Sequence, residues 1–275
     1  MAISMYLVFT KAKKDATLQS DGTALKKGEG IKQVNNGELM VVKILFDNKR
    51  IDPIYHAGWG VSFLIGNNIL FDTGENAAHL FSNMYQAGVN IQDISTVVIS
   101  HEHFDHMGGL WDMLRQKQKI DIYICPSFSK GFKNKAKTYN CNIIEVSHFT
   151  EITKNIYTTG EIGGFYGFDG FAEQSLVINT KKGLTIITGC AHPGIVRIVE
   201  HVKDHIKGNI HLVIGGFHLL NESPYRIMQI IEELIQLGVT NIGPCHCTGK
   251  LAERYFRDFY RDHYVDVFAG QTIEI

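Results

Sequence analysis

Residues 96–109 of this chain read TVVISHEHFDHMGG. The β-branched start of this stretch predicts a buried strand, so the polar residues lie at its carboxyl end. Alternation along an extended chain sends His101 and His103 to one side, and Asp105 and His106 open the next segment after a turn. A single histidine is usually an ordinary core or surface residue, but imidazoles and a carboxylate at this density favour zinc, iron or a similar cation. We therefore predict that these four residues bind one or two metal ions.

The same stretch resembles the HxHxDH signature of the metallo-β-lactamase superfamily, and two further motifs extend the resemblance from about Met40 onward. Residues 69–74, ILFDTG, are similar to the superfamily's first motif, which implies that Asp72 orients the metal ligands without touching the metal. Residues 242–249, IGPCHCTG, are similar to its last motif, which implies that His246 completes the metal site. The fold implied by this resemblance is α/β, a four-layer αβ/βα sandwich of the metallo-β-lactamase type.

Length and hydropathy patterning agree with one layered domain. Of the 275 residues, 44% are hydrophobic, which is enough for a substantial core. Apolar strands alternate with helical segments, as in α/β folds, and one helix is predicted to start at Ser223-Pro224 and to stop at Gly238. We expect a single metallo-β-lactamase-like domain over residues 39–275. Residues 1–38 are expected to be an irregular N-terminal segment, because most of them are polar and rich in glycine and lysine.

Residues 185–194, TIITGCAHPG, depart from the superfamily's common pattern. Most members place a histidine before this strand and an aspartate at its end, where this chain has Cys190, followed by His192. A thiolate is a reasonable zinc or iron ligand, although a lone cysteine is more often a small buried residue. Two alternatives stay open for the missing histidine: Glu173 takes its place, or the ligand has moved to His192.

The combination of GCxHPGI, IGGFH and PCHCTG resembles one branch of the superfamily, the 7,8-dihydropterin-6-methyl-4-(β-D-ribofuranosyl)aminobenzene 5′-phosphate synthase-like proteins. The resemblance implies a metal-dependent enzyme with a binuclear site and a phosphorylated or pyrophosphorylated small-molecule substrate of pterin type. The metals would supply stabilisation of a pyrophosphate leaving group during attack on the pterin methylene. Two other functions stay open, a general metallo-hydrolase of an ester, lactone or phosphodiester, and a non-catalytic metal-binding sensor or partner protein.

We expect two divalent metal ions, with zinc favoured over manganese and iron. Cys190 or a water molecule would lie between the two ions. In this assignment the first ion is held by His101, His103 and His192, and the second by Asp105, His106 and His246. Asp105 would in addition steady the nucleophile, which makes it a candidate catalytic residue.

A weak internal repeat adds a further candidate residue. Residues 62–74 and 175–189 each read as a hairpin of two apolar strands, and each is followed by a helical segment and another strand. Aligning the halves sets His218 opposite His103 and predicts that His218 enters the same cleft. We expect His218 to act in acid/base chemistry or in substrate binding, against the alternative of a histidine that ends a strand without chemistry.

Three segments are candidates for contact with substrate. Arg197, just inside the helix after His192, is predicted to bind an anionic group. Trp59 and the aromatic residues of the glycine-rich segment 160–170 could stack a pterin, although they are as plausible as loop anchors. The lysine-rich segment 130–137 reads first as solvated charge and second as a phosphate partner.

Charge and cysteine content restrict the partners and the compartment. The net charge of −1, from 27 basic and 28 acidic residues, argues against a dedicated nucleic-acid or acidic-membrane surface. No stretch is long enough to span a membrane. Five cysteines without a secretory signal predict a reduced, cytoplasmic protein. Cys245 and Cys247 flank His246, and strand alternation would point both away from the metal, which favours packing roles. No pattern indicates an oligomeric state.

Overall fold

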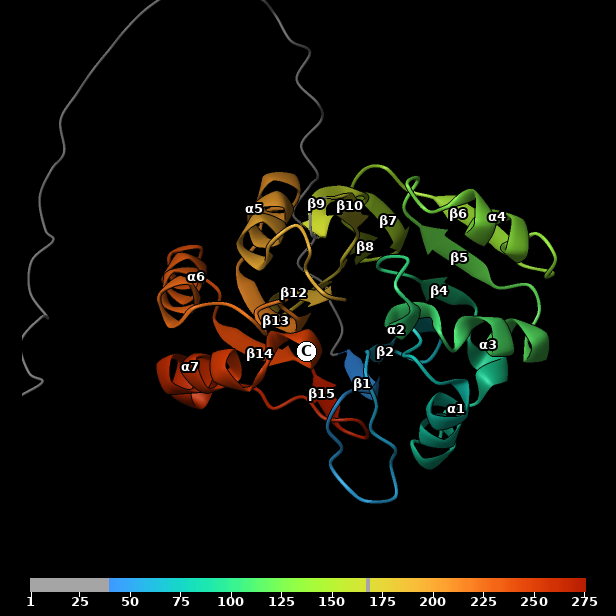
Figure 1. Cartoon of the computed structure of the whole chain (residues 1–275), viewed down its shortest axis with the longest axis horizontal. Coiled ribbons are helices and arrows are strands. Elements are labelled where there is room, and N and C mark those ends of the chain that lie inside the picture. The colour runs from blue at the N-terminus through green and yellow to red at the C-terminus, as the bar shows by residue number, and fades with distance from the viewer. Residues whose placement is uncertain (1–39, 167–168) are drawn as a thin grey trace, which may run out of the picture. The chain divides into compact units, whose positions relative to one another are not determined.

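The computed structural model describes residues 40–166 and 169–275, so the predicted irregular segment over residues 1–38 lies outside these ranges. Two β-sheets form the centre of the described part, with helices on both sides of the pair (Figure 1). A separate hairpin of β9 (Ile162–Tyr166) and β10 (Asp169–Glu173) stands beside them.

The first sheet has seven strands in the order β15-β1-β2-β3-β4-β5-β6, and β3 to β6 are parallel neighbours. Its members are β1 (Val41–Phe46), β2 (Ser62–Ile65), β3 (Ile69–Phe71), β4 (Thr96–Val98), β5 (Asp121–Ile124), β6 (Asn142–Glu145) and β15 (Thr272–Glu274). The second sheet has six strands in the order β14-β13-β12-β11-β8-β7, and β12 to β14 are parallel neighbours. Its members are β7 (Thr150–Thr153), β8 (Ile156–Thr158), β11 (Leu176–Thr180), β12 (Gly183–Thr188), β13 (Ile210–Gly216) and β14 (Asn241–Cys245).

Six longer helices lie outside the sheets, three on each side (Figure 1). Those beside the first sheet are α1 (Ala77–Gln86), α3 (Leu110–Gln116) and α4 (Lys130–Ala136); those beside the second are α5 (Ile195–His205), α6 (Pro224–Gln236) and α7 (Lys250–Tyr260). Short turns are α2 (Phe104–Met107) and the 3-10 helices η1 (Ile91–Asp93), η2 (His246–Thr248) and η3 (Arg261–His263). The start and stop predicted for α6 are confirmed, because the Ser223 side chain accepts the Arg226 amide and Gly238 follows the last turn.

Three apolar layers hold this arrangement together. Along β3, Ile69 and Phe71 face the second sheet, whereas Leu70 faces the helices. Along β13, Ile214 faces the first sheet, whereas Val213 faces α5 and α6. Each central strand therefore buries both faces, as parallel strands in α/β folds do. The predicted four-layer αβ/βα sandwich is confirmed.

The weak internal repeat has a counterpart in the strand pairing. In the first sheet, β2 and β3 pair antiparallel and β3 then pairs parallel with β4. In the second sheet, β11 and β12 pair antiparallel and β12 then pairs parallel with β13. The two halves therefore share one topology, and the segment after β4 corresponds to the segment after β13.

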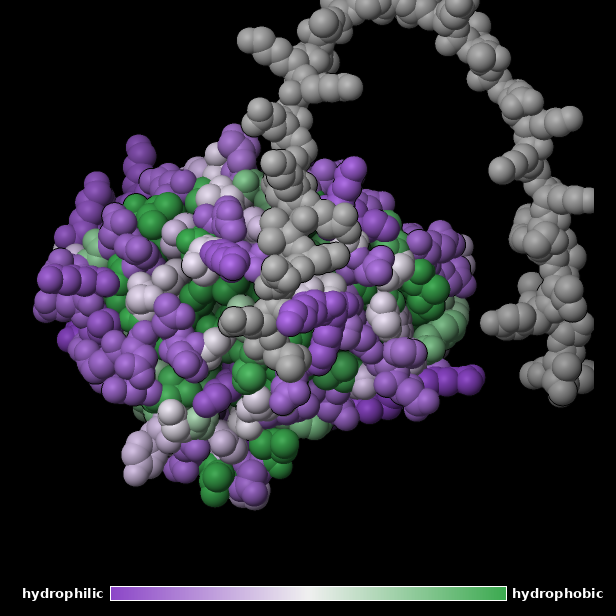
Figure 2. Space-filling view, turned by 180° about the vertical axis from the view of Figure 1, so that it is seen from behind, coloured by the Kyte–Doolittle hydropathy of each residue, from purple (hydrophilic) through white to green (hydrophobic). Residues whose placement is uncertain are grey.

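The surface of the described part is mixed. Figure 2 shows that hydrophilic side chains cover much of the coloured face seen from behind, with apolar ones in smaller patches between them. Over residues 40–166 and 169–275, no helix has the length and apolar character needed to cross a bilayer.

Phe71→Ala tests the layer between the sheets. Phe71 is fully buried there, so we expect the variant to lose about 3–5 kcal/mol of unfolding free energy, measured by urea denaturation. Tyr85→Ala is the control, because Tyr85 is 80% exposed and its removal should change stability by about 0.5 kcal/mol or less. Equal effects of the two substitutions would contradict the layered core.

Candidate metal centre

Apart from Trp59 and Arg197, the predicted site residues lie in segments that follow the carboxyl ends of five strands. Asp72 follows β3, and His101 and His103 follow β4 in the first sheet. Cys190 and His192 follow β12, His218 follows β13, and His246 follows β14 in the second sheet. Loops at the carboxyl ends of parallel strands are the usual place for ligand sites in α/β folds, because neighbouring strands end at the same edge.

Four of these loop residues have left-handed backbone. The φ angles are 55° at Asp72, 60° at Ala191, 54° at His218 and 52° at His246. Non-glycine residues adopt this region at an energetic cost and tend to do so at functional sites, where surrounding contacts hold them. The chain therefore turns sharply just after β3, β12, β13 and β14.

One group of possible metal ligands consists of His101, His103 and His192, whose ring nitrogens lie within 4.8 Å of one another. Nε2 of His101 is 3.1 Å from Nδ1 of His103. Burial and the neighbouring imidazoles lower the pKa of His101 well below its usual value and that of His192 to about 3. These rings are therefore neutral, and the neutral ring is the form that ligates a metal. Phe171, on β10, stacks on His103 with ring centres 4.5 Å apart.

A second group consists of Asp105, His106, Cys190 and His246, with ligand atoms again within 4.8 Å. The Cys190 sulfur is 3.1 Å from Nε2 of His106 and 3.4 Å from Nε2 of His246. Asp105 Oδ2 lies 3.4 Å and 3.2 Å from the same two nitrogens. Although burial opposes its charge, the contacts with His106 and His246 hold the pKa of Asp105 well below its usual range. Asp105 is therefore an ionised carboxylate facing two imidazoles and a thiol.

Asp72 lies behind the second group and reaches the first through Ser100, whose hydroxyl is 2.8 Å from Nδ1 of His101. Its carboxylate accepts hydrogen bonds from the Ser100 amide and hydroxyl, both at 2.7 Å, and lies 2.7 Å from Nδ1 of His106. Burial opposes protonation of His106, but Asp72 and Asp105 outweigh it and raise the pKa to about 10, so without a metal the ring is protonated at neutral pH. If a metal displaces the proton on Nε2, the N–H at Nδ1 leaves Nε2 as the lone-pair atom facing the second group. This geometry is the one expected of a residue that orients a metal ligand.

Asn48 has the corresponding position beside His246. Its amide oxygen is 3.3 Å from Nδ1 of His246, and its amide nitrogen donates to the His246 carbonyl at 3.0 Å. The loop between β1 and β2 therefore holds both the ring and the backbone of His246. Sequence reasoning did not identify Asn48, because nothing in residues 47–48 indicates a contact almost 200 positions away.

Glu173 lies outside both ligand groups. Burial raises its pKa to about 7, and the backbone N–H groups of His192, Ala191 and Cys190 oppose that rise by hydrogen bonding to the carboxylate. Of the two alternatives for the missing histidine, the structure brings His192, and not Glu173, among the possible ligands.

The expectation that Cys247 points away from the site is wrong. Its sulfur, the Cys190 sulfur and a ring nitrogen of His218 lie within 4.8 Å of one another. Strand alternation does not apply, because β14 ends at Cys245 and η2 begins at His246. Cys245 does point away, into the apolar layer between the sheets. A glycine two residues after Cys247 was the available signal for a turn.

The two groups open into a pocket of about 300 Å³. His218 and Trp59 lie in its wall; residue Trp59 is 43% exposed, and the centre of its ring is 4.7 Å from that of His246. Arg197 instead lines a neighbouring pocket of about 400 Å³, which shares His192 and His218 with the first. Its guanidinium donates to the Gly163 carbonyl at 2.7 Å. The side chains of Phe165, Tyr166 and Phe168 lie outside the described residues.

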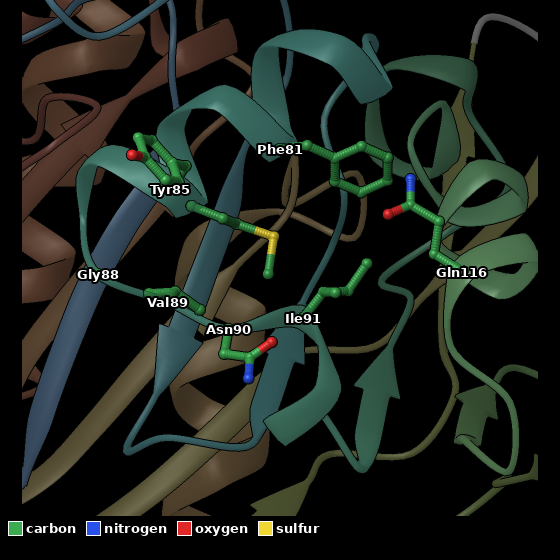
Figure 3. A pocket seen from close by; sticks show the side chains of 8 residues that line it. Phe81, Tyr85, Gly88, Val89, Asn90, Ile91 and Gln116 are labelled. Carbon is green, nitrogen blue, oxygen red and sulfur yellow. The ribbon is translucent and has the colours of Figure 1, made fainter.

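A third pocket, of about 460 Å³, lies between α1 and the loop that follows it. Figure 3 shows Phe81 and Ile91 pointing into a common space, with the amides of Asn90 and Gln116 at its edge. Among its described lining residues there is no carboxylate, imidazole, thiol or amine. The chemistry of the described part therefore concentrates at the carboxyl edge of the sheets.

The chain matches the family model of the metallo-beta-lactamase superfamily over residues 60–226. It is 31% identical to the 7,8-dihydropterin-6-methyl-4-(beta-D-ribofuranosyl)-aminobenzene-5′-phosphate synthase of Methanocaldococcus jannaschii, over 78% of this chain and 89% of that protein. A solved structure, Tm1679, described as a metal-dependent hydrolase of the beta-lactamase superfamily, has 28% identity, a TM-score of 0.73, and coverage of 86% and 99%. The metallo-beta-lactamase fold protein YhfI from Bacillus subtilis, at 13% identity, a TM-score of 0.64 and the same coverage, shares the fold.

Asp72→Asn tests the support behind the two ligand groups. The amide cannot accept all three hydrogen bonds, so His106 and the Ser100 turn lose part of their anchorage. We expect zinc affinity, measured by competition with a chromophoric chelator, to fall about 10–100-fold. Asp93→Asn, on the exposed η1 turn, is the matched control and should leave affinity unchanged. Unchanged affinity in Asp72→Asn would contradict the supporting role.

Proposed function

The chain belongs to the metallo-β-lactamase superfamily and is one of its enzymes, and from this premise we propose that it is a binuclear metalloenzyme acting on a phosphorylated or pyrophosphorylated substrate of pterin type. The observation that carries the proposal is the pair of ligand groups beside one pocket. One group offers three imidazoles, and the other offers two imidazoles, a carboxylate and a thiol.

These donor sets fit divalent cations. Imidazole, thiolate and carboxylate are the ligands that zinc takes in proteins, and each group offers at least three donor atoms at one place. Burial raises the pKa of the Cys190 thiol, so that thiol is uncharged until a cation lies beside it. In the proposed assignment His101, His103 and His192 hold one cation, and Asp105, His106 and His246 hold the other, with Cys190 at its side. Bound there, a pair of cations supplies Lewis-acid polarisation and lowers the pKa of water.

Asp105 and His218 carry the proposed proton chemistry. Asp105 is ionised and lines the pocket, so its carboxylate can orient a nucleophile and accept its proton. His218 lies in the pocket wall, and its hydrogen bond with Cys247 raises its pKa despite partial burial. A protonated imidazole there can donate a hydrogen bond or a proton to a phosphate leaving group.

Trp59 and Arg197 are the proposed substrate contacts. The half-exposed Trp59 ring in the pocket wall offers a surface on which a flat heterocycle can stack. Arg197 lies near the start of α5, in the neighbouring pocket that shares His192 and His218, where a guanidinium suits a phosphate. That pocket also carries Arg226, which pairs with Glu233 at 3.3 Å, and two further glutamates, Glu200 and Glu222.

The synthase from Methanocaldococcus jannaschii supports the substrate class, because the chain is similar to it over most of both lengths. The second candidate function is hydrolysis of an ester, lactone or phosphodiester, which the similarity to Tm1679 favours. The non-catalytic alternative receives no support, since these similar proteins are described as enzymes.

Metal content tests the binuclear site. We expect wild-type protein purified without chelator to carry about two equivalents of divalent metal per chain, measured by elemental mass spectrometry. His103→Ala and Cys190→Ala should each carry less, because each removes a donor from one group. His148→Ala, which removes an exposed imidazole elsewhere, should match the wild type. One equivalent or none in the wild type would contradict the proposal.

A paired substrate assay separates transfer from hydrolysis. Protein is incubated with the diphosphate ester of 6-hydroxymethyl-7,8-dihydropterin, with and without 4-(β-D-ribofuranosyl)aminobenzene 5′-phosphate, and inorganic diphosphate release is measured. Release that depends on the aromatic acceptor supports a transferase, and release without it supports a hydrolase. Absence of turnover in both reactions, with both metals bound, would contradict the pterin-type substrate.

His218→Asn tests the proton donor in the same assay. Asparagine tolerates the left-handed backbone at this position, so the variant should fold and bind metal normally. Loss of the imidazole should lower kcat by about 100- to 10,000-fold with a smaller change in KM. A kcat equal to that of the wild type would exclude His218 from proton transfer.

A further inference from the structure

Glu173, the last residue of β10, and Gln174, which follows it, are consecutive buried polar residues just before β11. Polar groups are buried at a free-energy cost unless hydrogen bonds compensate them. Hydrogen bonds compensate both side chains. Glu173 binds the turn after β12 in the second sheet, whereas the Gln174 side-chain nitrogen binds carbonyls of the first sheet and its oxygen binds Thr158 of β8 in the second.

The Glu173 carboxylate binds the turn that follows β12. Oε1 accepts the amides of Cys190 and Ala191 at 2.8 and 2.9 Å, and Oε2 accepts the amide of His192 at 2.8 Å. Among the described residues, no lysine or arginine makes an ion pair with this carboxylate. Three amides of one turn are therefore its main partners. That turn contains the left-handed Ala191 and carries Cys190 and His192 into different ligand groups.

Gln174 binds the end of β4 in the other sheet. Its backbone amide donates to the Ser100 carbonyl at 2.9 Å, and its side-chain nitrogen donates to the carbonyls of Ile99 and Tyr123 at 2.8 and 3.0 Å. Its side-chain oxygen accepts the Thr158 hydroxyl at 2.5 Å. Ser100 is the residue directly before His101, so Gln174 fixes the point from which the HxHxDH segment starts.

We propose that Glu173 and Gln174 form a strut that sets the distance between the ligand loop of the first sheet and the ligand loop of the second. This inference rests on the proposed binuclear function. Both are positioning residues, because neither side chain belongs to a ligand group. The two loops come from separate sheets, so the covalent chain does not fix the distance between them. Two adjacent residues that are hydrogen-bonded to the two loops can fix this distance.

The chemistry of a glutamine at position 173 makes the inference specific. Its amide oxygen can accept the bonds of Cys190 and Ala191, which share Oε1, but its NH₂ group would then face the His192 amide, another donor. The damage should therefore concentrate at His192 and the first ligand group. The second group receives Cys190 from the same turn and should lose less.

The test compares Glu173→Gln with Glu161→Gln in the full-length protein. Glu161 also accepts a backbone amide, that of Ser127 at 2.8 Å, but at an exposed position. The first readout is hydrogen exchange of the amides of residues 190–192 in metal-free protein. We expect exchange there to be at least about tenfold faster in Glu173→Gln than in Glu161→Gln or the wild type.

The second readout is zinc titration against a chromophoric chelator. Glu173→Gln should keep one cation near wild-type affinity and bind the other about 10–100-fold more weakly. Glu173→Asp, which keeps the charge on a shorter side chain, should recover part of the affinity. Thermal unfolding of each variant shows whether a loss comes from a damaged fold, and Glu173→Asp serves if Glu173→Gln does not fold.

The outcomes separate this inference from the proposed function. Wild-type exchange rates at residues 190–192 together with two unchanged cation affinities in Glu173→Gln would overturn the strut. If the wild type binds fewer than two cations, the binuclear proposal fails, and faster exchange confined to residues 190–192 in Glu173→Gln would still support the strut.

Discussion

The apolar layer between the two sheets is the constraint on which the site depends. Phe63 and Phe71 from one sheet and Ile187 and Ile214 from the other belong to this layer, which has almost no exposed surface. Removing such area from water is the main favourable contribution to folding. Because packing fixes the sheets face to face, the carboxyl ends of β3 and β4 open beside those of β12, β13 and β14. Proposed ligands that are distant in the sequence then meet at one edge.

A fold that brings so many polar groups to a buried edge must compensate each of them. Asp72 accepts three hydrogen bonds, and Glu173 accepts three more, without a lysine or arginine beside either carboxylate. Backbone amides, and for Asp72 also the Ser100 hydroxyl and the His106 ring, take the place of a lysine or arginine. These partners are held rigidly by the surrounding backbone. Each carboxylate therefore has its buried charge compensated, and it also holds a turn in a left-handed conformation. The same hydrogen bonds therefore compensate the buried carboxylates and position the turns.

The two halves contribute unequally to this edge. The first half supplies a compact run, with three imidazoles and a carboxylate between His101 and His106. The second half supplies residues from three separate loops. Cys190 and His192 follow β12, His218 follows β13, and His246 follows β14. A compact run has its geometry set locally, whereas separate loops need long-range anchors. Asn48 and Glu173 are those anchors, and both lie outside the motifs that carry the ligands.

The local pattern of apolar and polar residues was enough to predict the layered fold, the HxHxDH cluster and the weak internal repeat, because alternation and β-branched runs depend on neighbouring residues. The same patterning failed at Cys247. The backbone at His246 turns left-handed under contacts from Asp47 and Asn48, which are nearly 200 positions away, so no local rule for side-chain direction applies. Local patterning also left two roles open for Glu173, because a carboxylate can ligate a metal or accept hydrogen bonds from backbone amides, and the neighbouring sequence does not distinguish the two. Only the tertiary structure places three backbone amides around Glu173, because they come from a turn on another strand.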